Sequence, residues 1–145
     1  MVNAHIDISQ GLDGEPVVLA CFDLSEEQLA ASAHAVKAAS AEEFRTADMS
    51  VDDVLQLREL TALSDELADL ALRPGMRTVV LRPARLSVYR DAIARFIETR
   101  DNGEWIREED REPLARVRGI LSALEDLSAD AVRAALSGSA SSRTA

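Results

Sequence analysis

Aromatic side chains are scarce in this sequence, where Phe, Tyr and Trp together make up 3% of 145 residues. Proteins that hold single-stranded nucleic acid stack the bases on aromatic rings, and this chain offers few such platforms. Its formal net charge of −10 also repels a phosphate backbone. We therefore expect no nucleic-acid binding, and a core built mainly from Leu, Val, Ile and Ala.

Cysteine occurs once, at Cys21, which excludes an intramolecular disulfide bond. The sequence has no run of about 20 apolar residues and no basic start followed by an apolar segment. These absences predict a cytoplasmic protein without membrane contact. Arg outnumbers Lys fifteen to one, a bias typical of a GC-rich bacterial genome.

The short motifs that identify common enzymes and cofactor sites are also missing. There is no phosphate-binding loop, dinucleotide fingerprint, HExxH, CxxC, EF-hand loop or GxSxG turn. His5, Asp7, His34 and Cys21 are metal-binding residue types, but their spacing matches no metal site, and an inert thiol in an apolar strand is the simpler reading of Cys21. We expect no catalytic residue, no metal and no cofactor.

What the sequence does contain is the composition of a folded domain, with 47% hydrophobic and 29% charged residues. A domain of this size buries roughly 68–70% of the surface that its unfolded chain exposes. We predict a single domain over residues 1–138. The Ser- and Ala-rich residues 139–145 are expected to form a flexible tail.

Three segments have the patterns of β-strands. Residues 4–9 alternate polar and apolar side chains, which indicates a half-buried strand, and residues 17–22 form a continuous apolar run. The turn residues between them predict a hairpin. A third strand is predicted at 77–82, and its direction is left open.

Helix start and stop signals follow the strands. Ser25 and Gln28 have the spacing of a capping box before a helix that is predicted to end near Ala39. Ser50 begins a second helix over about 51–72, which Pro74-Gly75 terminates. This second helix carries two apolar faces and therefore needs two neighbours.

Three further helices are predicted in the rest of the chain. The third begins at Pro83 or Ser87 and ends by 101–103, and the fourth begins at Pro113. Ser128 is read as the cap of a short fifth helix that ends near Gly138. The expected fold class is α+β, with a small sheet packed by about five helices.

The chain also matches itself at a nearly constant offset, 62 positions for one pair of segments and 61 for two others. This pattern predicts an internal duplication: two tandem strand-helix-helix units, 15–75 and 77–138, after an N-terminal strand. Chance matching among abundant Leu, Ala, Val and Ser is the alternative. The matched pairs are 17–25 with 79–87, 43–44 with 104–105, and 60–65 with 121–126.

Charge is unevenly divided between the halves. Residues 1–72 carry 15 acidic and 3 basic side chains, whereas 73–118 carry 8 acidic and 11 basic ones. Arg82, Arg85 and Arg90 follow the third strand, where a strand-to-helix junction suits a phosphate or carboxylate. The alternative is that these arginines pair with the excess acids of the first half.

Two segments, Glu42-Glu43-Phe44 and Glu104-Trp105, place carboxylates beside an aromatic ring in predicted loops. A carboxyl group against an aromatic ring can have a raised pKa and act as an acid or base. The simpler interpretation, which we prefer, is an aromatic that fills the core while the acids cap the next helix.

Two functions remain. The first is a non-enzymatic interaction or regulatory protein, a homodimer or a binder of a protein partner, that uses apolar helix faces or exposed sheet edges. The second is a domain that binds a small anionic ligand, or a modest enzyme, with its pocket between the two units. The residues predicted to line that pocket are Arg82, Arg85, Tyr89, Trp105 and Phe44.

Overall fold

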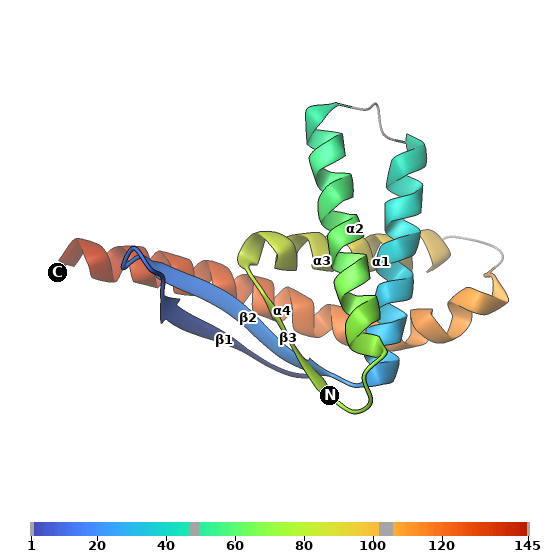
Figure 1. Ribbon diagram of the computed structural model, residues 1–145, viewed down its shortest axis with the longest axis horizontal. Coiled ribbons are helices and arrows are strands. Elements are labelled where there is room, and N and C mark those ends of the chain that lie inside the picture. Colours follow the sequence, from blue (N-terminus) through green and yellow to red (C-terminus); the bar gives the residue numbers. More distant parts are fainter. Residues whose placement is uncertain (1, 47–49, 102–105, 145) are drawn as a thin grey trace.

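The computed structural model describes residues 2–46, 50–101 and 106–144, and in these residues the chain forms a three-stranded sheet and four helices (Figure 1). The α+β class is therefore confirmed. The elements are β1 (Asn3–Gln10), β2 (Pro16–Leu24), α1 (Glu26–Thr46), α2 (Val51–Ala71), β3 (Arg77–Leu81), α3 (Pro83–Asp101) and α4 (Glu108–Thr144).

The sheet is antiparallel throughout and has the strand order β1-β2-β3. The predicted β1–β2 hairpin is confirmed, with Ile6 opposite Ala20 and a turn in which Gly14 has a φ of 81°. A positive φ is readily adopted only by glycine, which explains the residue at this turn. Between β2 and β3, Ala20 lies opposite Leu81, so the two predicted strands share one sheet.

The two faces of the sheet have different surroundings. Phe22 and Val79 point to the face that packs against the helices and are buried. Cys21 points to the other face, in register with His5 of β1 and Val80 of β3. Burial, and then the nearby charges of Asp7 and Asp23, raise the pKa of the Cys21 thiol. The thiol is consequently protonated and unreactive at neutral pH.

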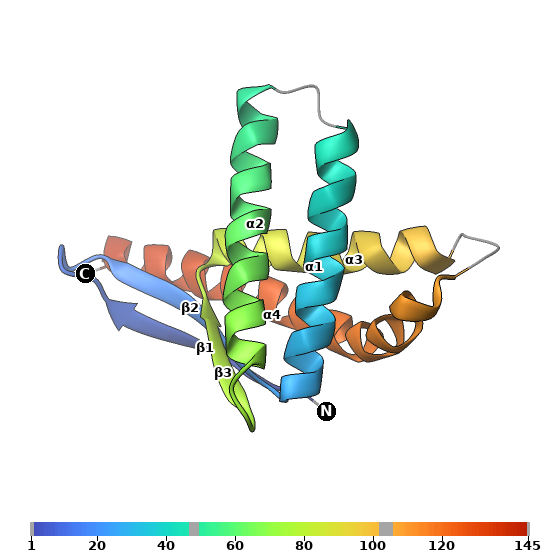
Figure 2. The same cartoon turned by 45° about the vertical axis from the view of Figure 1, so that its right-hand side comes forward.

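Helices α1 and α2 form an antiparallel hairpin, and the end of it that is farther from the sheet projects from the remainder of the molecule (Figures 1 and 2). The predicted caps are confirmed. Ser25 N–H donates to Gln28 Oε1 over 2.9 Å while Gln28 N–H donates to Ser25 Oγ over 3.1 Å, and Asp53 N–H donates to Ser50 Oγ.

Helix α1 is longer than predicted, because it continues past Ala39 to Thr46. No Pro or Gly interrupts residues 40–46, so nothing in the backbone ends the helix earlier. The placement of Glu42-Glu43-Phe44 in a loop was therefore wrong, since these residues belong to the last turns of α1.

The half of the hairpin nearest the sheet contributes to the core. Leu63 and Leu67 of α2 are fully buried, as is Tyr89 of α3, whose hydroxyl donates a hydrogen bond to the buried Ser32 of α1. The Tyr89 ring makes an edge-to-face contact with Phe22 of β2, with centroids 5.8 Å apart. One core thus connects the sheet, α1, α2 and α3.

The prediction of five helices was wrong, because the expected fourth and fifth helices form one helix, α4. It starts at Glu108, before Pro113, and runs beyond Gly138 to Thr144. Ser128 does not cap a new helix; its Oγ donates to the carbonyl of Leu124 one turn earlier, a bond that serine makes inside a helix. Although α4 is long, neither it nor any other described helix is apolar enough to cross a membrane.

The element order β2-α1-α2 is followed by β3-α3-α4, which agrees with the order expected of two units. The lengths of the helices differ between the units, however: α1 and α2 have 21 residues each, whereas α3 has 19 and α4 has 37. The matched segment Glu104-Trp105 lies outside the described residues. The internal duplication is not confirmed and stays a prediction.

Candidate functional site

Two of the predicted ligand-binding residues, Arg82 and Arg85, lie together at the start of α3. They line a shallow hollow of about 450 Å³ that also includes Glu59 and Glu66 of α2. Arg85 Nη2 is 2.9 Å from Glu59 Oε2, and its Nη1 is 3.4 Å from Glu66 Oε2. The guanidinium group of Arg85 therefore already has two carboxylate partners from the acidic half of the chain.

Two of the other three predicted residues, Tyr89 and Phe44, do not line this hollow. Tyr89 is completely buried, so its ring is inaccessible to a ligand. Phe44 lies at the far end of the α1–α2 hairpin and is 66% exposed. Trp105 lies outside the described residues. Ligand binding by this set of five residues stays a prediction.

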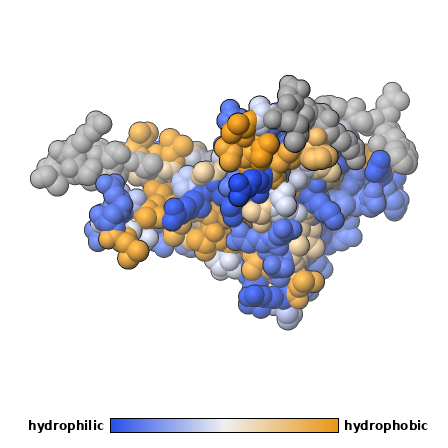
Figure 3. Space-filling model, turned by 45° about the horizontal axis from the view of Figure 1, so that its top comes forward, coloured by the Kyte–Doolittle hydropathy of each residue, from blue (hydrophilic) through white to orange (hydrophobic). Residues whose placement is uncertain are grey.

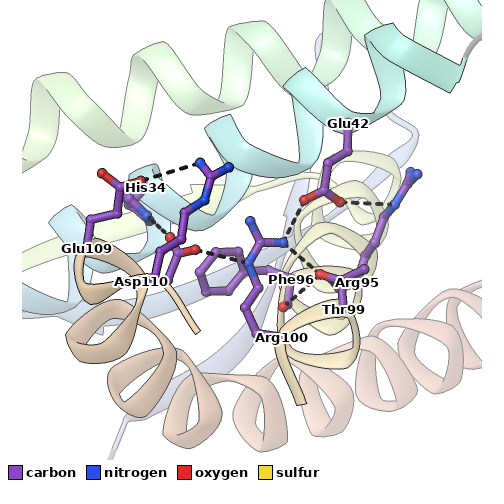
Figure 4. Close-up of polar contacts among 9 residues, drawn as sticks. His34, Glu42, Arg95, Phe96, Thr99, Arg100, Glu109 and Asp110 are labelled. Atoms are coloured by element: carbon purple, nitrogen blue, oxygen red, sulfur yellow. Dashed lines mark hydrogen bonds and ion pairs between the residues drawn. The ribbon is translucent and has the colours of Figure 1, made fainter. Parts of the chain in front are cut away.

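A polar cluster that the sequence did not reveal joins three helices around Asp110 (Figure 4). Helix α1 supplies His34 and Glu42, α3 supplies Arg95 and Arg100, and the first turn of α4 supplies Asp110. We call these five residues the Asp110 cluster. It borders a polar cavity of about 700 Å³ between the three helices.

Asp110 is the centre of this cluster because its two carboxylate oxygens have different partners. Oδ1 is 2.7 Å from His34 Nε2, and Oδ2 accepts a hydrogen bond from Arg100 Nε over 3.4 Å. Arg100 in turn contacts Glu42 Oε1 through Nη1 over 2.6 Å, and its guanidinium carbon lies 4.4 Å from the centre of the Phe96 ring. The buried carboxylate is thus compensated by two polar partners.

The electrostatics of Asp110 favour its ionised form. Burial alone would raise the pKa of this carboxyl group, but the hydrogen bond from His34 and the charge of Arg100 together lower it below its ordinary value. An ionised carboxylate accepts protons and hydrogen bonds, so Asp110 is poorly suited to act as a general acid. The arrangement is that of an ion network that fixes α1 against α3 and α4.

No local sequence pattern could have revealed the Asp110 cluster. His34 and Asp110 are 76 positions apart, and only the folded chain brings them together. The remaining metal-binding residue types do not gather either. Across residues 2–46, 50–101 and 106–144, no group of three His, Cys, Asp or Glu side chains is close enough to hold a metal ion.

The second candidate site is an apolar groove beside the N-terminal half of α2. Large hydrophobic side chains are exposed here, with Val51 at 76%, Leu55 at 52% and Val54 at 39%. In Figure 3, which brings this end of the hairpin forward, hydrophobic surface is visible there. The groove has a volume of about 480 Å³ and is lined by Phe44, Val54, Leu57, Arg58, Thr61, Ala62 and Asp65, which we call the α2 groove.

The groove explains why α2 has two apolar faces. One face carries Leu60, Leu63 and Leu67, which are buried in the core. The opposite face begins with Val51 and Leu55, and at this end of the hairpin the described part of the chain leaves it uncovered. Within the described residues, one of the two neighbours that the sequence predicts for α2 is therefore not found along this stretch.

Comparisons with known proteins give no guide to the role of either site, because no protein-family model, curated protein or solved structure matches this chain. Function is therefore argued from the geometry of the sites themselves.

Proposed function

We propose that this chain is a non-enzymatic, cytoplasmic protein-interaction domain that presents the far end of its α1–α2 hairpin to a protein partner. The observation that carries this proposal is the uncovered apolar face of α2 next to Phe44. A contiguous apolar area on an otherwise charged surface is typical of a protein-binding site.

Energetics support this use of the hairpin end. Burying one Val, Leu or Phe side chain contributes roughly 1.5–3 kcal/mol, and four such side chains are exposed toward this end of the hairpin: Phe44 and Val54, which line the α2 groove, and Val51 and Leu55 beside it on α2. The same four side chains contribute little to the stability of the isolated chain. Their burial contributes free energy only in a complex, where a partner removes them from water.

The Asp110 cluster supports a non-enzymatic role. Its carboxylates are engaged by Arg and His side chains from neighbouring helices, which is the pattern of a structural ion network. A catalytic acid must have a proton to donate and a catalytic base must be free to accept one from the substrate. We assign the cluster to fixing α1 against α3 and α4 between His34 and Glu42, so that the far end of the hairpin is held in a defined position.

Self-association is a second part of the proposal, and strand β1 is the favoured place for it. The strand order leaves β1 at an edge of the sheet, with eight residues whose outward-facing backbone groups have no strand partner in the described chain. Such an edge can pair with the same edge of a second copy. Sedimentation as a monomer at every concentration would contradict this part.

The alternative function is the binding of a small anionic ligand in the hollow beside Arg82 and Arg85. Arg82 is exposed there, and among the described residues no carboxylate lies within ion-pair distance of it. The paired state of Arg85 weakens this alternative, because an anion must compete with Glu59 and Glu66. Saturable binding of inorganic phosphate that is lost in Arg82→Ala would favour it.

The proposed function is tested by photo-crosslinking in the cells that produce the protein. Leu55 is replaced by a photoreactive amino acid, and Leu12 and Val132, which are exposed apolar residues on other surfaces, are replaced in matched controls. We expect one specific crosslinked protein from position 55 and none from the controls. Equal crosslinking at all three positions would contradict the proposal.

A further inference from the structure

We infer that the α2 groove binds an amphipathic helix of a partner protein that carries apolar side chains at one end of its contact face and Lys or Arg at the other. This inference rests on the proposed function and names the class of partner. It follows from the shape of the groove, from its charge and from the order of residues along α2.

The residues of α2 that line the groove form a straight row along which a helix can lie. Val54, Arg58, Thr61 and Asp65 all line it and recur at intervals of three or four, which makes one stripe along α2. Thr61 and Ala62 occupy the middle of the stripe, and both are small and exposed. Small residues let another helix approach closely, while Phe44 of α1 forms one wall of the groove.

The stripe changes in character from one end to the other. It begins at the exposed Val54, next to the exposed apolar residues Val51 and Leu55, and ends at the exposed Asp65, one turn before the exposed Asp69. At 1.5 Å per residue, Val54 and Asp65 are about 16 Å apart along the axis of α2. A partner helix that covers the stripe must therefore present apolar and then basic side chains over about three turns.

The charge of the hairpin favours a basic partner. Residues 26–71 contain eleven acidic and three basic side chains, a balance of −8 in a chain whose net charge is −10. Glu59 and Glu66 are paired with Arg85 on the side toward α3. By contrast, within the described residues no basic side chain lies within ion-pair distance of Asp65 or Asp69.

The same charges argue against a second copy of this chain in the groove. A symmetric α2–α2 contact would bring the acidic residues of both copies to one interface, where like charges are unfavourable. Helix α2 alone has six acids and one base. Self-association is therefore assigned to another surface, and the groove to a partner of opposite charge.

Arg58 is the exception, because it is the one basic residue of α2 and lines the groove between its apolar and acidic ends. Its long side chain can turn toward solvent and leave only its apolar stem in the contact. Against a basic partner, the guanidinium group is repulsive. Removing the charge of Arg58 should therefore strengthen the binding of a basic partner. A contact made only by apolar side chains would show no such increase in affinity.

The test uses a synthetic helical peptide of about 18 residues, stapled on its solvent face, with Leu at one end of the contact face and Lys at the other. One control peptide has Glu in place of Lys, and another has the same composition in scrambled order. Fluorescence anisotropy with the full chain measures the affinities. We expect both controls to bind at least about tenfold more weakly than the designed peptide.

Protein variants locate the contact. Val54→Ser together with Leu55→Ser should weaken binding by about tenfold or more, since it removes the apolar end. Asp65→Asn and Asp69→Asn should each weaken it about threefold, while Arg58→Gln should strengthen it about threefold.

Leu12→Ser and Glu125→Gln are matched controls on other surfaces and should not change the affinity for the peptide. All these positions are exposed, so the variants should remain folded, as circular dichroism would verify.

Each outcome decides between interpretations. Equal binding of the designed and scrambled peptides would mean non-specific charge attraction and would overturn the inference. If no peptide binds but position 55 still crosslinks to a partner, the inference fails while the proposed function stands. Loss of self-association in the Val54→Ser, Leu55→Ser protein would assign the groove to a second copy instead. Absence of specific crosslinks at position 55 would refute the proposed function itself.

Discussion

The two ends of the α1–α2 hairpin are built from the same residue types but have opposite surroundings. Near the sheet, Leu60, Leu63 and Leu67 are buried against neighbouring elements. At the far end, Val51 and Leu55 of the same helix are more than half exposed. Composition alone therefore does not decide which side chains form the core; the elements that cover them do.

Polar contacts to the rest of the molecule are also unevenly distributed along the hairpin. Helix α1 is attached to α4 by His34 and to α3 by Glu42, and α2 is attached to α3 by Glu59 and Glu66. We therefore regard these contacts as the anchor of the hairpin, and the exposed start of α2 from Val51 to Leu55 as the interaction surface. Four comparisons test this division, from the largest expected effect to the smallest.

The first compares two leucines of one helix. Leu63→Ala should lower the free energy of unfolding by about 2–5 kcal/mol, because it leaves a cavity in the core. Leu55→Ala, at the exposed end, should change it by less than about 0.5 kcal/mol. Urea denaturation measures both. Similar losses in the two variants would show that the far end is also part of the core.

The second concerns the carboxylate that fixes α1. Asp110→Asn should lower the free energy of unfolding by about 1–3 kcal/mol at neutral pH, because the amide cannot replace an ionised acceptor of two hydrogen bonds. Folding lowers the pKa of Asp110, so its contribution is fully present above its ordinary value of 3.8 and is lost as the pH falls below it.

Denaturation of both proteins across the acid range checks this sign. The difference between wild type and Asp110→Asn should shrink as the pH falls below 3.8, where the carboxylate becomes protonated. Glu125→Gln, an exposed acid on the same helix, is the control and should show no such difference. A difference that grows in acid would mean that Asp110 is not stabilised as a carboxylate.

The third tests the pairing of α2 with α3. Arg85→Ala should lower the free energy of unfolding by about 1 kcal/mol or less, because the two ion pairs are partly exposed. The loss should be smaller in high salt, which screens exposed charges. Arg111→Ala, which removes one more exposed pair, should have no measurable effect. An equal loss in both variants would remove any special role for Arg85.

The fourth concerns the exposed end alone. Val54→Ser should change the free energy of unfolding by no more than about 0.5 kcal/mol, and binding of a hydrophobic dye should decrease because one exposed apolar side chain is gone. Thermal unfolding and dye fluorescence measure the two effects. A clear loss of stability together with unchanged dye binding would contradict the assignment of the far end as an interaction surface.

Local chemistry explains which parts of this fold could be predicted from the sequence. The caps at Ser25 and Ser50 depend on residues three positions apart, and the alternation of β1 depends on adjacent residues, so both are visible in the chain. The prediction at Ser128 was wrong because a serine hydroxyl has two uses. It accepts a hydrogen bond from a following N–H when it caps a helix, and it donates one to a preceding carbonyl when it lies inside a helix. Sequence alone does not distinguish the two.

Contacts between distant segments were beyond local reasoning. The uneven charge of the two halves led to the alternative that Arg82, Arg85 and Arg90 pair with acids of the first half, and among the described residues Arg85 alone of these three does so. Arg95, Arg100 and Arg116 make such pairs without having been singled out. Which arginine meets which acid depends on the packing of α1, α2, α3 and α4. The Asp110 cluster and the α2 groove both arise from that packing.

The position of the hairpin between β2 and β3 has a consequence for the order of folding. Leu24 at the end of β2 is paired with Arg77 at the start of β3, so the whole hairpin lies between two residues that touch. Closing a long flexible loop is entropically unfavourable, but a hairpin that forms first brings the start of β3 back to the end of β2. We expect α1 and α2 to be protected from pulsed hydrogen exchange before the β2–β3 amides. The far end of the hairpin would then be in place for a partner while the sheet is still incomplete.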